Sequence, residues 1–374
     1  MHVLHLIKTS EGATWAINLI KELKFRYTDL TFSVIIPNGG KHVHKYYEIC
    51  RNVYLFDYNL NYNLINQGVK FRRIVIKDEP DIIHSWFSQT TLYSRFFLRN
   101  IKTPRLFQVV GPLHLENSIF KYFDIKSAQS NDYWVGTSKY ILNKYRESKI
   151  IEKKLFLNYA YIDTDKLLES KDDIALLDFR KEHKIPERFK IIGTASYIYP
   201  PKFYNKTGVK GHEQLLEVFA ELLKVRDDVV LVIAGTTFGD NQSYLKSLEL
   251  KASKISKEKI FFTGKYSNIY NVISIFDVFV YLSRSENLGG VFESLLFEVP
   301  TVSSDRGALP ELVINNETGF NVPLNNNKLI VSKILELLSS DNESIKVKGK
   351  LKVQQLFDKN KIIEKAYLIY KEIV

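Results

Sequence analysis

Short apolar runs alternate with amphipathic segments along the whole chain. In the first half, Val3–Ile7 is an apolar run, and residues 13–24, after the turn at Gly12, have apolar positions at helical spacing. Strands that alternate with helices in this way predict a parallel sheet covered by helices. The further strands predicted in this half are residues 32–37, 81–84, 105–110, 133–136 and 155–158.

The same alternation starts again at Lys190–Ala195, which predicts a new first strand. The helix predicted after it, Glu213–Lys224, has five large apolar side chains on one face. Between the two halves, residues 163–189 are polar and charged, with Pro186 near the restart. The further strands predicted in this half are Val229–Ala234, Lys259–Thr263, Asp277–Leu282 and Thr301–Ser303.

The pattern therefore predicts an α/β protein with two doubly wound, Rossmann-like domains that face a central cleft. We place the first domain at residues 1–185 and the second at residues 186–355, and we expect a C-terminal helix, residues 356–374, to cross back to the first domain. Because ligands of open parallel sheets bind beyond the carboxyl ends of the strands, the candidate chemistry is sought in the loops after the strands.

Composition narrows the class of protein. Of the 374 residues, 45% are apolar and 25% are charged, which is typical of a soluble globular chain. Cys50 is the only cysteine, so an intramolecular disulfide and a Cys-rich zinc module are excluded. No apolar run approaches the length that spans a bilayer, and the opening stretch Met1–Lys8 is predicted to be a strand rather than a signal peptide. We expect a cytoplasmic protein, free or peripheral on the inner face of the membrane.

The formal net charge is +11, and it is unevenly distributed. Residues 1–190 hold 30 Lys and Arg against 21 Asp and Glu, which is +9 of the total. Such asymmetry indicates a polyanion or an anionic membrane surface as partner, or else a solvated basic surface without one. No nucleic-acid-binding motif is visible, so that class is disfavoured. The 22 Tyr and 24 Phe belong mostly to the cores, and some of them, with the lysines, are candidates for a membrane-surface patch.

Two loops of the second half carry candidate chemistry. The loop from Ser283 contains two carboxylates, Glu286 and Glu293, with Gly289 and Gly290 between them. A carboxylate can bind a pair of sugar hydroxyls, and glycines let backbone N–H groups approach a ligand closely. The alternative is a glycine turn followed by an acidic first helical turn.

The other loop, residues 196–212, contains three lysines and opens a helix, which suits a diphosphate. Its alternative is a solvated, lysine-rich surface loop. Both loops follow strands of one sheet, so we expect them to face one cleft. The three lysines are Lys202, Lys206 and Lys210.

Taken together, these residues resemble the retaining glycosyltransferases of family 4, which have the GT-B fold and include bacterial polysaccharide-type enzymes. The resemblance covers about 130 residues of the second half, in order and spacing. The first half agrees more loosely. The matching motifs are Lys210–Gly211, Gly235, Phe262–Gly264, Ser283–Glu286, Glu293 with Pro300, Pro310–Glu311 and Thr318–Gly319, and in the first half Glu11–Ala13, Pro80–His84, Phe107–His114, Asp132–Ser138 and Asn158–Asp163.

The resemblance implies a role for each matched position. Lys210 would bind the donor diphosphate, Glu293 the nucleotide ribose, and Glu286 the donor sugar together with the backbone of the next four residues. In the first half, Gly12 would let a turn approach the diphosphate, and His114 would lie near the reacting sugar. Those four residues after Glu286 are Asn287, Leu288, Gly289 and Gly290.

Two departures from the family pattern stand out. Six residues separate Glu286 from Glu293, where the family usually has seven. The missing residue lies in the loop between the two glutamates, so the shorter loop bears on the role assigned to Glu286. The family also usually has an Arg near the end of the first strand, and this chain has none there. Lys202 is the candidate for the second positive charge.

The resemblance implies transfer of a sugar from a nucleoside diphosphate sugar to a saccharide or lipid-linked saccharide acceptor in cell-surface glycan synthesis, with retention. Because lysines and helix N-terminal amides can stabilise the leaving group, we expect no metal and no cofactor. The alternative is a non-catalytic GT-B-like protein that binds a sugar nucleotide or a glycan. The loop with Glu286 and Glu293 argues against a phosphorylase- or epimerase-type protein. For His84 a structural or cleft-lining role is favoured over a catalytic one.

Overall fold

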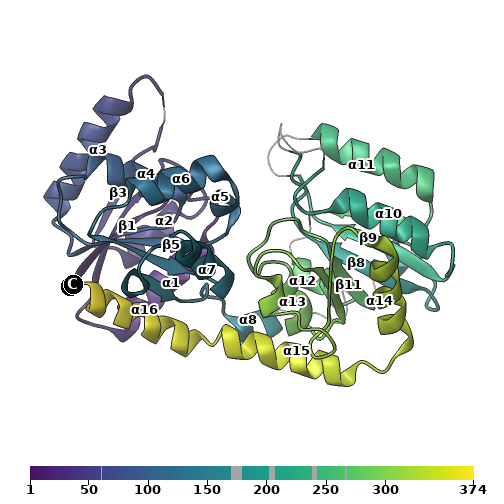
Figure 1. Ribbon diagram of the computed structural model, residues 1–374. Helices are drawn as coiled ribbons and strands as arrows, with labels where there is room; N and C mark the ends of the chain where they lie inside the picture. The colour runs from purple at the N-terminus through teal and green to yellow at the C-terminus, as the bar shows by residue number, and fades with distance from the viewer. Residues whose placement is uncertain (60, 170–178, 202–206, 238–241, 266–267) are drawn as a thin grey trace. The chain divides into compact units, whose positions relative to one another are not determined.

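The computed structural model describes residues 1–59, 61–169, 179–201, 207–237, 242–265 and 268–374. The chain forms two compact units, one of residues 1–162 with 357–374 and the other of residues 163–356 (Figure 1). The sequence placed the change of domain near residue 185. The structure places it earlier because Phe179 and Ile185 are buried and the ring of His183 packs 5.3 Å from that of Phe261, in the second unit.

The first unit contains a seven-stranded parallel sheet with the order β3-β2-β1-β4-β5-β6-β7. Its central strands are apolar and buried on both faces, as expected where helices cover a parallel sheet. The strands are β1 (His2–Leu6), β2 (Thr31–Ile36), β3 (Asn52–Leu55), β4 (Ile82–Ser85), β5 (Arg105–Val109), β6 (Asp132–Gly136) and β7 (Leu155–Leu157). The helices are α1 (Thr14–Arg26), α2 (Val43–Ile49), α3 (Leu64–Asp78), α4 (Ser88–Phe97), α5 (Leu113–Glu116), α6 (Ser118–Ser127) and α7 (Lys139–Glu147).

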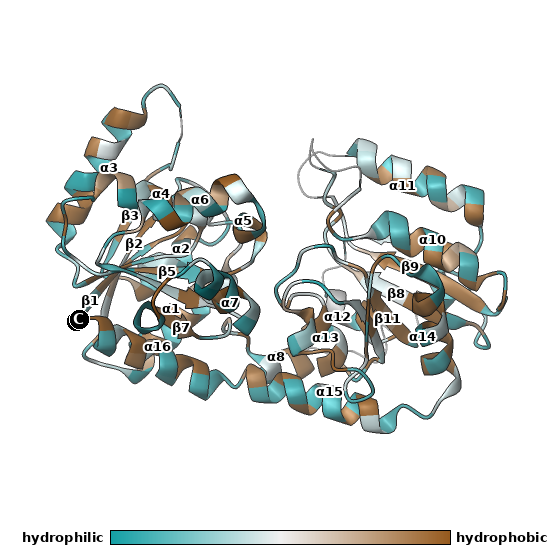
Figure 2. Cartoon of the chain, viewed as in Figure 1, coloured by the Kyte–Doolittle hydropathy of each residue, from teal (hydrophilic) through white to brown (hydrophobic). Residues whose placement is uncertain are grey.

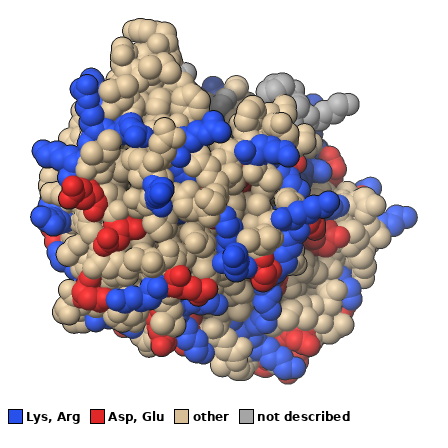
Figure 3. All heavy atoms as spheres, turned by 60° about the vertical axis from the view of Figure 1, so that its left-hand side comes forward, with Lys and Arg blue, Asp and Glu red and all other residues tan. Residues whose placement is uncertain are grey.

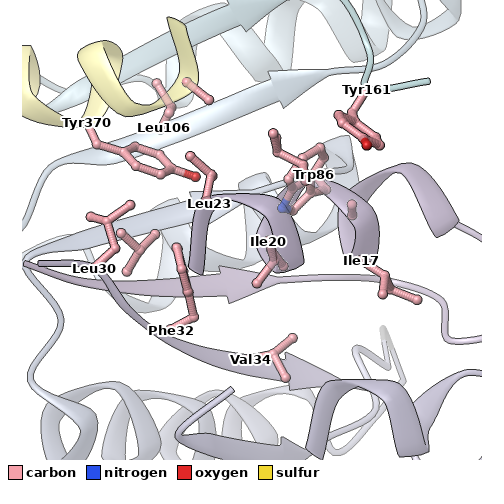
Figure 4. Close-up of a cluster of buried hydrophobic side chains, with 14 of the residues drawn as sticks. Ile17, Ile20, Leu23, Leu30, Phe32, Val34, Trp86, Leu106, Tyr161 and Tyr370 are labelled. Atoms are coloured by element: carbon pink, nitrogen blue, oxygen red, sulfur yellow. The ribbon is translucent and has the colours of Figure 1, made fainter. Parts of the chain in front are cut away.

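The C-terminal helix α16 (Lys359–Ile373) belongs to the first unit. It buries apolar side chains in the core beside α1, where Tyr370 lies near Leu23 and Leu30 (Figure 4). The Tyr370 hydroxyl lies 2.7 Å from Nδ1 of His84, and burial lowers the pKa of His84 to about 3. His84 is therefore a neutral, packed residue of this core.

The second unit contains a six-stranded parallel sheet with the order β10-β9-β8-β11-β12-β13, whose central strands are hydrophobic (Figure 2). β8 and β9 have the bounds that the sequence predicts, whereas the short strands β3 and β13 were not predicted. The strands are β8 (Lys190–Ala195), β9 (Val229–Ala234), β10 (Ile260–Gly264), β11 (Val278–Tyr281), β12 (Thr301–Ser304) and β13 (Phe320–Val322). The helices are α8 (Thr164–Glu169), α10 (His212–Leu222), α11 (Gln242–Ile255), α12 (Ile269–Ile273), α13 (Val291–Leu296), α14 (Asn327–Ser339) and α15 (Glu343–Leu356).

The two sheets confirm the predicted α/β class, since every pair of neighbouring strands is parallel in both. In each sheet the strand order reverses beside its first strand, at β1/β4 and at β8/β11. This reversal defines a doubly wound sheet and its switch point, where ligands bind. Within the described part of the chain, no helix combines the length and the apolar character that crossing a bilayer requires.

Candidate functional site

A pocket of about 400 Å³ lies at the switch point of the second sheet. Strands β8 and β11 pair side by side there, and the loops that follow them form its walls. A pocket at this place is where a doubly wound sheet binds its ligand. Its lining includes Ser196, Lys210, Gly235, Lys265, Tyr281 and Glu293.

Two side chains that line this pocket, those of Lys210 and Tyr281, meet the carboxylate of Glu286. Lys210 forms an ion pair with Glu286, and its ammonium donates a hydrogen bond of 2.9 Å to the hydroxyl of Tyr281. That hydroxyl in turn donates 2.7 Å to Oε2 of Glu286. The structure thus brings together two of the residues that the sequence singled out, and Tyr281 connects them. We call these three residues the Lys210 triad.

Glycines let the two loops approach each other closely enough for this contact. Gly211 has a φ of 72°, and a Cβ there would overlap the carbonyl oxygen of Leu282. Gly307 has a φ of 62°, and a Cβ there would overlap the carbonyl oxygen of Glu286. Any side chain at either position would therefore force the backbone apart.

Glu293 lies on the first turn of α13 and faces the pocket. Its Oε2 is buried and has no hydrogen-bond partner among the described residues. Burial, and to a lesser degree the charge of Glu286, raise the pKa of Glu293 to about 7, although the backbone N–H groups of Glu293 and Gly290 oppose the shift. A buried carboxylate oxygen without a donor is suited to accept one from a ligand.

The residues of the loop between the two glutamates have two different roles: some contact Glu286 or pack in the core, and others line the pocket. The backbone N–H of Asn287 donates 3.0 Å to Oε1 of Glu286, and Gly289 and Gly290 line the pocket. Leu288 is buried, so its side chain packs in the core and only its backbone is left for a ligand. The loop keeps Glu286 beside Lys210 despite being one residue shorter than the family pattern.

Sequence reasoning missed two residues of this site. Tyr281 lies in the predicted strand 277–282, and nothing in that apolar run distinguishes a tyrosine that lines a pocket from one that packs in the core. Lys265 follows β10 directly and lines the pocket, so it adds a second cation beside Lys210. A lysine immediately after a strand-ending Gly264 was the available signal. Lys202, the predicted second cation, lies outside the described residues.

His114 and Gly12 belong to the first unit. Nε2 of His114 lies 3.2 Å from both Oδ2 of Asp124 and the Tyr145 hydroxyl, so the imidazole is held by buried groups. At the predicted glycine turn, the left-handed residue is Ala13 with a φ of 58°, and a Cβ at Gly12 would meet nothing within 4 Å. The open space at Gly12 leaves room for close approach, but the turn itself does not require a glycine.

Among the described residues there is no cluster of three or more His, Cys, Asp and Glu side chains that would hold a metal ion. An Asp-x-Asp sequence occurs at Asp163–Asp165, where Asp163 accepts the backbone N–H of Lys166 (3.2 Å) at the start of α8. The carboxylate of Asp163 therefore binds the backbone at the start of α8.

Known proteins match the chain in sequence and in fold. Residues 179–351 match the family described as "Glycosyl transferases group 1". N-acetyl-alpha-D-glucosaminyl L-malate synthase from Bacillus anthracis is 21% identical over 249 residues, and this match covers 66% of the chain but only 61% of that relative's length. The capsular polysaccharide biosynthesis glycosyltransferase CapM from Staphylococcus aureus is 22% identical and matches over 98% of the chain and 96% of its own length.

The crystal structure of Anabaena HepE in complex with UDP-glucose superposes with a TM-score of 0.81 at 16% identity, over 99% of the chain and 100% of HepE. At this identity the likeness shows the fold. A glycosyltransferase structure from Rickettsia africae gives a TM-score of 0.79 at 20% identity, over 100% of the chain and 98% of its own. Residues 179–351 thus match the model of the glycosyl transferases group 1 family, and the two α/β units of the chain have the GT-B fold.

Proposed function

We propose that the protein is a retaining, metal-independent glycosyltransferase. It takes a sugar from a nucleoside diphosphate sugar and transfers it to a saccharide or lipid-linked saccharide acceptor in the synthesis of a cell-surface glycan. The observation that carries the proposal is the pocket at the β8/β11 switch point. Lys210 and Tyr281 of the Lys210 triad line this pocket together with Glu293, whose Oε2 has no partner among the described residues.

The donor diphosphate would be bound by Lys210. Lys210 precedes the first residue of α10, His212, by two positions, so a charged side chain and a helix dipole that both favour an anion belong to the same loop. Lys265 supplies further positive charge to the pocket. Glu293 would accept the hydroxyls of the nucleotide ribose through its unpartnered oxygen.

The donor sugar would be bound by Glu286 and by the backbone of Asn287–Gly290. Glu286 is paired with Lys210. A diphosphate bound to Lys210 would compete for the ammonium and leave Glu286 to accept sugar hydroxyls, with Tyr281 as a hydrogen-bond donor to it.

In the transfer step, the bond between the anomeric carbon and the diphosphate oxygen breaks, and an acceptor hydroxyl oxygen bonds to that carbon from the same face. The hydroxyl proton passes to the departing phosphate, and Lys210 compensates the negative charge that develops there. The transition state has oxocarbenium character, as in glycoside hydrolysis. We assign Gly12, Lys202 and His114 the supporting roles that the family pattern implies, on the diphosphate and near the reacting sugar.

The test is a thermal-shift screen of nucleoside diphosphates and their sugars, starting with UDP and UDP-glucose because HepE was crystallised with them. A hit is followed by NMR of the product anomer, with and without EDTA. Retained configuration and unchanged rates in EDTA are expected. Nucleotide binding with neither sugar transfer nor donor hydrolysis would instead favour the alternative, a non-catalytic protein that binds a sugar nucleotide.

A further inference from the structure

Ser196 is the first residue after β8, and it lines the pocket at the switch point. Its backbone N–H continues the pairing with β9 by donating 3.0 Å to the carbonyl oxygen of Ala234. The next residue of that strand end, Gly235, has a φ of 136°, and a Cβ there would overlap the carbonyl oxygen of Ser196. The Ser196 hydroxyl is therefore carried by a backbone that is fixed from the neighbouring strand.

The hydroxyl of Ser196 meets a buried imidazole. His212, the first residue of α10, is only 1% exposed, and its Nε2 lies 3.2 Å from Oγ of Ser196. The other ring nitrogen, Nδ1, is buried and has no hydrogen-bond partner among the described residues. His212 thus presents one nitrogen to a residue that lines the pocket and keeps the other in the core.

These contacts decide which nitrogen of His212 carries the hydrogen. Burial, and to a lesser degree the charge of Lys210, lower the pKa of His212 to about 4, so the imidazole is neutral near pH 7. A hydrogen on Nδ1 would be an unpaired buried N–H, which folded proteins rarely contain. The hydrogen therefore lies on Nε2, which donates it to Oγ of Ser196. The Ser196 hydroxyl then keeps its own hydrogen for an acceptor in the pocket.

The end of β8 brings no cation of its own to the pocket, because residues 191–201 contain neither Lys nor Arg. Lys210 is already paired with Glu286, and Lys265 follows β10, which β9 separates from β8 in the sheet. A neutral hydrogen-bond donor is therefore what this strand end offers to an anion.

The second unit as a whole does not attract anions either. Residues 163–356 contain 26 Lys and Arg against 26 Asp and Glu, so this unit has no formal net charge. The +11 of the chain belongs to the first unit, and the face in Figure 3 shows Lys and Arg spread widely over the surface. Binding of an anion in the pocket must therefore come from local groups.

We propose that the Ser196 hydroxyl donates a hydrogen bond to the diphosphate of the sugar donor, and that His212 is the positioning residue that orients this hydroxyl. The imidazole N–H and the hydroxyl then form a chain of two hydrogen bonds that ends on a phosphate oxygen, and each bond polarises the other. The pair binds an anion without placing a further cation in the pocket, whose desolvation would cost free energy. The inference rests on the proposed function, because it concerns the same pocket.

The first experiment measures binding of UDP, GDP and ADP by calorimetry and of uridine, guanosine and adenosine by ligand-observed NMR. For the nucleoside diphosphate that the wild type binds most tightly, we expect Ser196→Ala to weaken binding about tenfold, because a hydrogen bond to a charged group is lost. Binding of the matching nucleoside should not change, since it lacks the phosphates. Ser196→Thr keeps the hydroxyl and should bind the diphosphate like the wild type.

The second experiment tests whether His212 acts through Ser196. His212→Leu removes the N–H donor and should weaken diphosphate binding about as much as Ser196→Ala, whereas His212→Gln retains a side-chain N–H and should restore most of the affinity. Because the imidazole would act only through the hydroxyl, the double variant Ser196→Ala with His212→Leu should bind about as well as Ser196→Ala alone.

Matched controls come from the second unit, away from the lining of the pocket. Ser247→Ala removes a hydroxyl that donates 2.7 Å to the carbonyl oxygen of Tyr244. His183→Leu removes an imidazole whose Nε2 is buried and whose ring packs 5.3 Å from that of Phe261. Both controls should bind nucleoside diphosphates like the wild type.

Three results would overturn the proposal: unchanged diphosphate binding in Ser196→Ala, an equal loss of diphosphate and nucleoside binding, or additive losses in the double variant. The second and third would show that the contact between Ser196 and His212 only supports the fold. If no nucleotide bound to the wild type, the proposed function would fail and this inference with it. Diphosphate binding that depends on Ser196, without sugar transfer, would count against the proposed function alone.

Discussion

Two buried carboxylates, one in each unit, have pKa values that are shifted in opposite directions. Asp124 of the first unit accepts hydrogen bonds from Arg95 and Tyr145 and lies beside His114, and despite its burial these contacts lower its pKa to about 2. Glu293 of the second unit has one oxygen without a partner among the described residues, and burial raises its pKa to about 7.

The difference teaches which buried charge holds the fold together and which is left for a ligand. Asp124 is charged because its partners are built into the core, and removing Arg95 would take away the buried cation that compensates this charge. Oε2 of Glu293 has no such partner among the described residues, so the folded protein tolerates the charge of this carboxylate only at a cost in stability. A group in that condition in the lining of a switch-point pocket is the one we propose for ligand binding.

The most severe test of this contrast removes the cation from the pocket. We expect Lys210→Ala to reduce transfer at least about a hundredfold, because the leaving diphosphate loses its principal compensating charge. Unfolding in urea should stay near that of the wild type, since Glu286 still accepts from Tyr281. Lys350→Ala is the matched control, because Lys350 pairs with Glu298 at 2.9 Å outside the pocket. Near-normal transfer by Lys210→Ala would refute the role of Lys210.

The next test removes the paired carboxylate. Asp124→Asn should lower the free energy of unfolding by about 3 kcal/mol, because it replaces one of the two carboxylates that pair with the buried Arg95 by a neutral amide and leaves only Asp132. Urea denaturation followed by circular dichroism measures this. Because the folded pKa of Asp124 lies below its ordinary 3.8, its stabilisation is present above pH 3.8 and is lost as the pH falls through about 2, so the deficit should shrink in acid. Wild-type stability at pH 7 would show that Asp124 does not hold the core.

The unpartnered carboxylate should respond with the opposite sign. The folded pKa of Glu293 is about 7, above its ordinary 4.5, so its contribution to stability is greatest below pH 4.5 and is lost as the pH rises through about 7. Glu293→Gln does not titrate, and we expect it to be more stable than the wild type by about 2 kcal/mol at pH 8. At pH 5 the difference in the free energy of unfolding between Glu293→Gln and the wild type should nearly disappear.

The same Glu293→Gln protein should bind nucleoside diphosphates more weakly at pH 8, as measured by calorimetry. A variant that lost stability at pH 8, or that bound the nucleotide with wild-type affinity, would remove the contrast between the two carboxylates.

The smallest expected effect belongs to the hydroxyl that joins the triad. Tyr281→Phe removes the hydrogen bonds to Lys210 and Glu286 but keeps the ring, and we expect kcat/KM to fall about tenfold, or about 1.4 kcal/mol. Tyr370→Phe is the matched control, since it removes a buried tyrosine hydroxyl that lies 2.7 Å from His84 in the first unit. Equal kinetics of both variants would exclude a positioning role for Tyr281.

Much of the fold was predictable because buried parallel strands leave a strong signal. Lys190–Ala195 and Val229–Ala234 are near-continuous apolar runs, and their predicted bounds agree with β8 and β9. The strand Asn52–Leu55 was missed because its residues are mixed in polarity and only partly buried, and Phe320–Val322 because it is three residues long. The motifs identified Lys210, Glu286 and Glu293, because residues that lie close together in a loop after a strand can be recognised from their spacing in the sequence.

The sequence by itself determined two α/β units, the loops that carry charge in the second, and the excess of positive charge in the first. Only the tertiary structure decided which groups face each other. It joined Lys210 to Glu286 through Tyr281, and it turned Asp124 inward and Phe120 outward on one short helix. Local periodicity predicts the reverse for that helix. The physical reason is that the partner of Asp124, the buried Arg95, lies 29 residues away in the chain, where no local pattern records it.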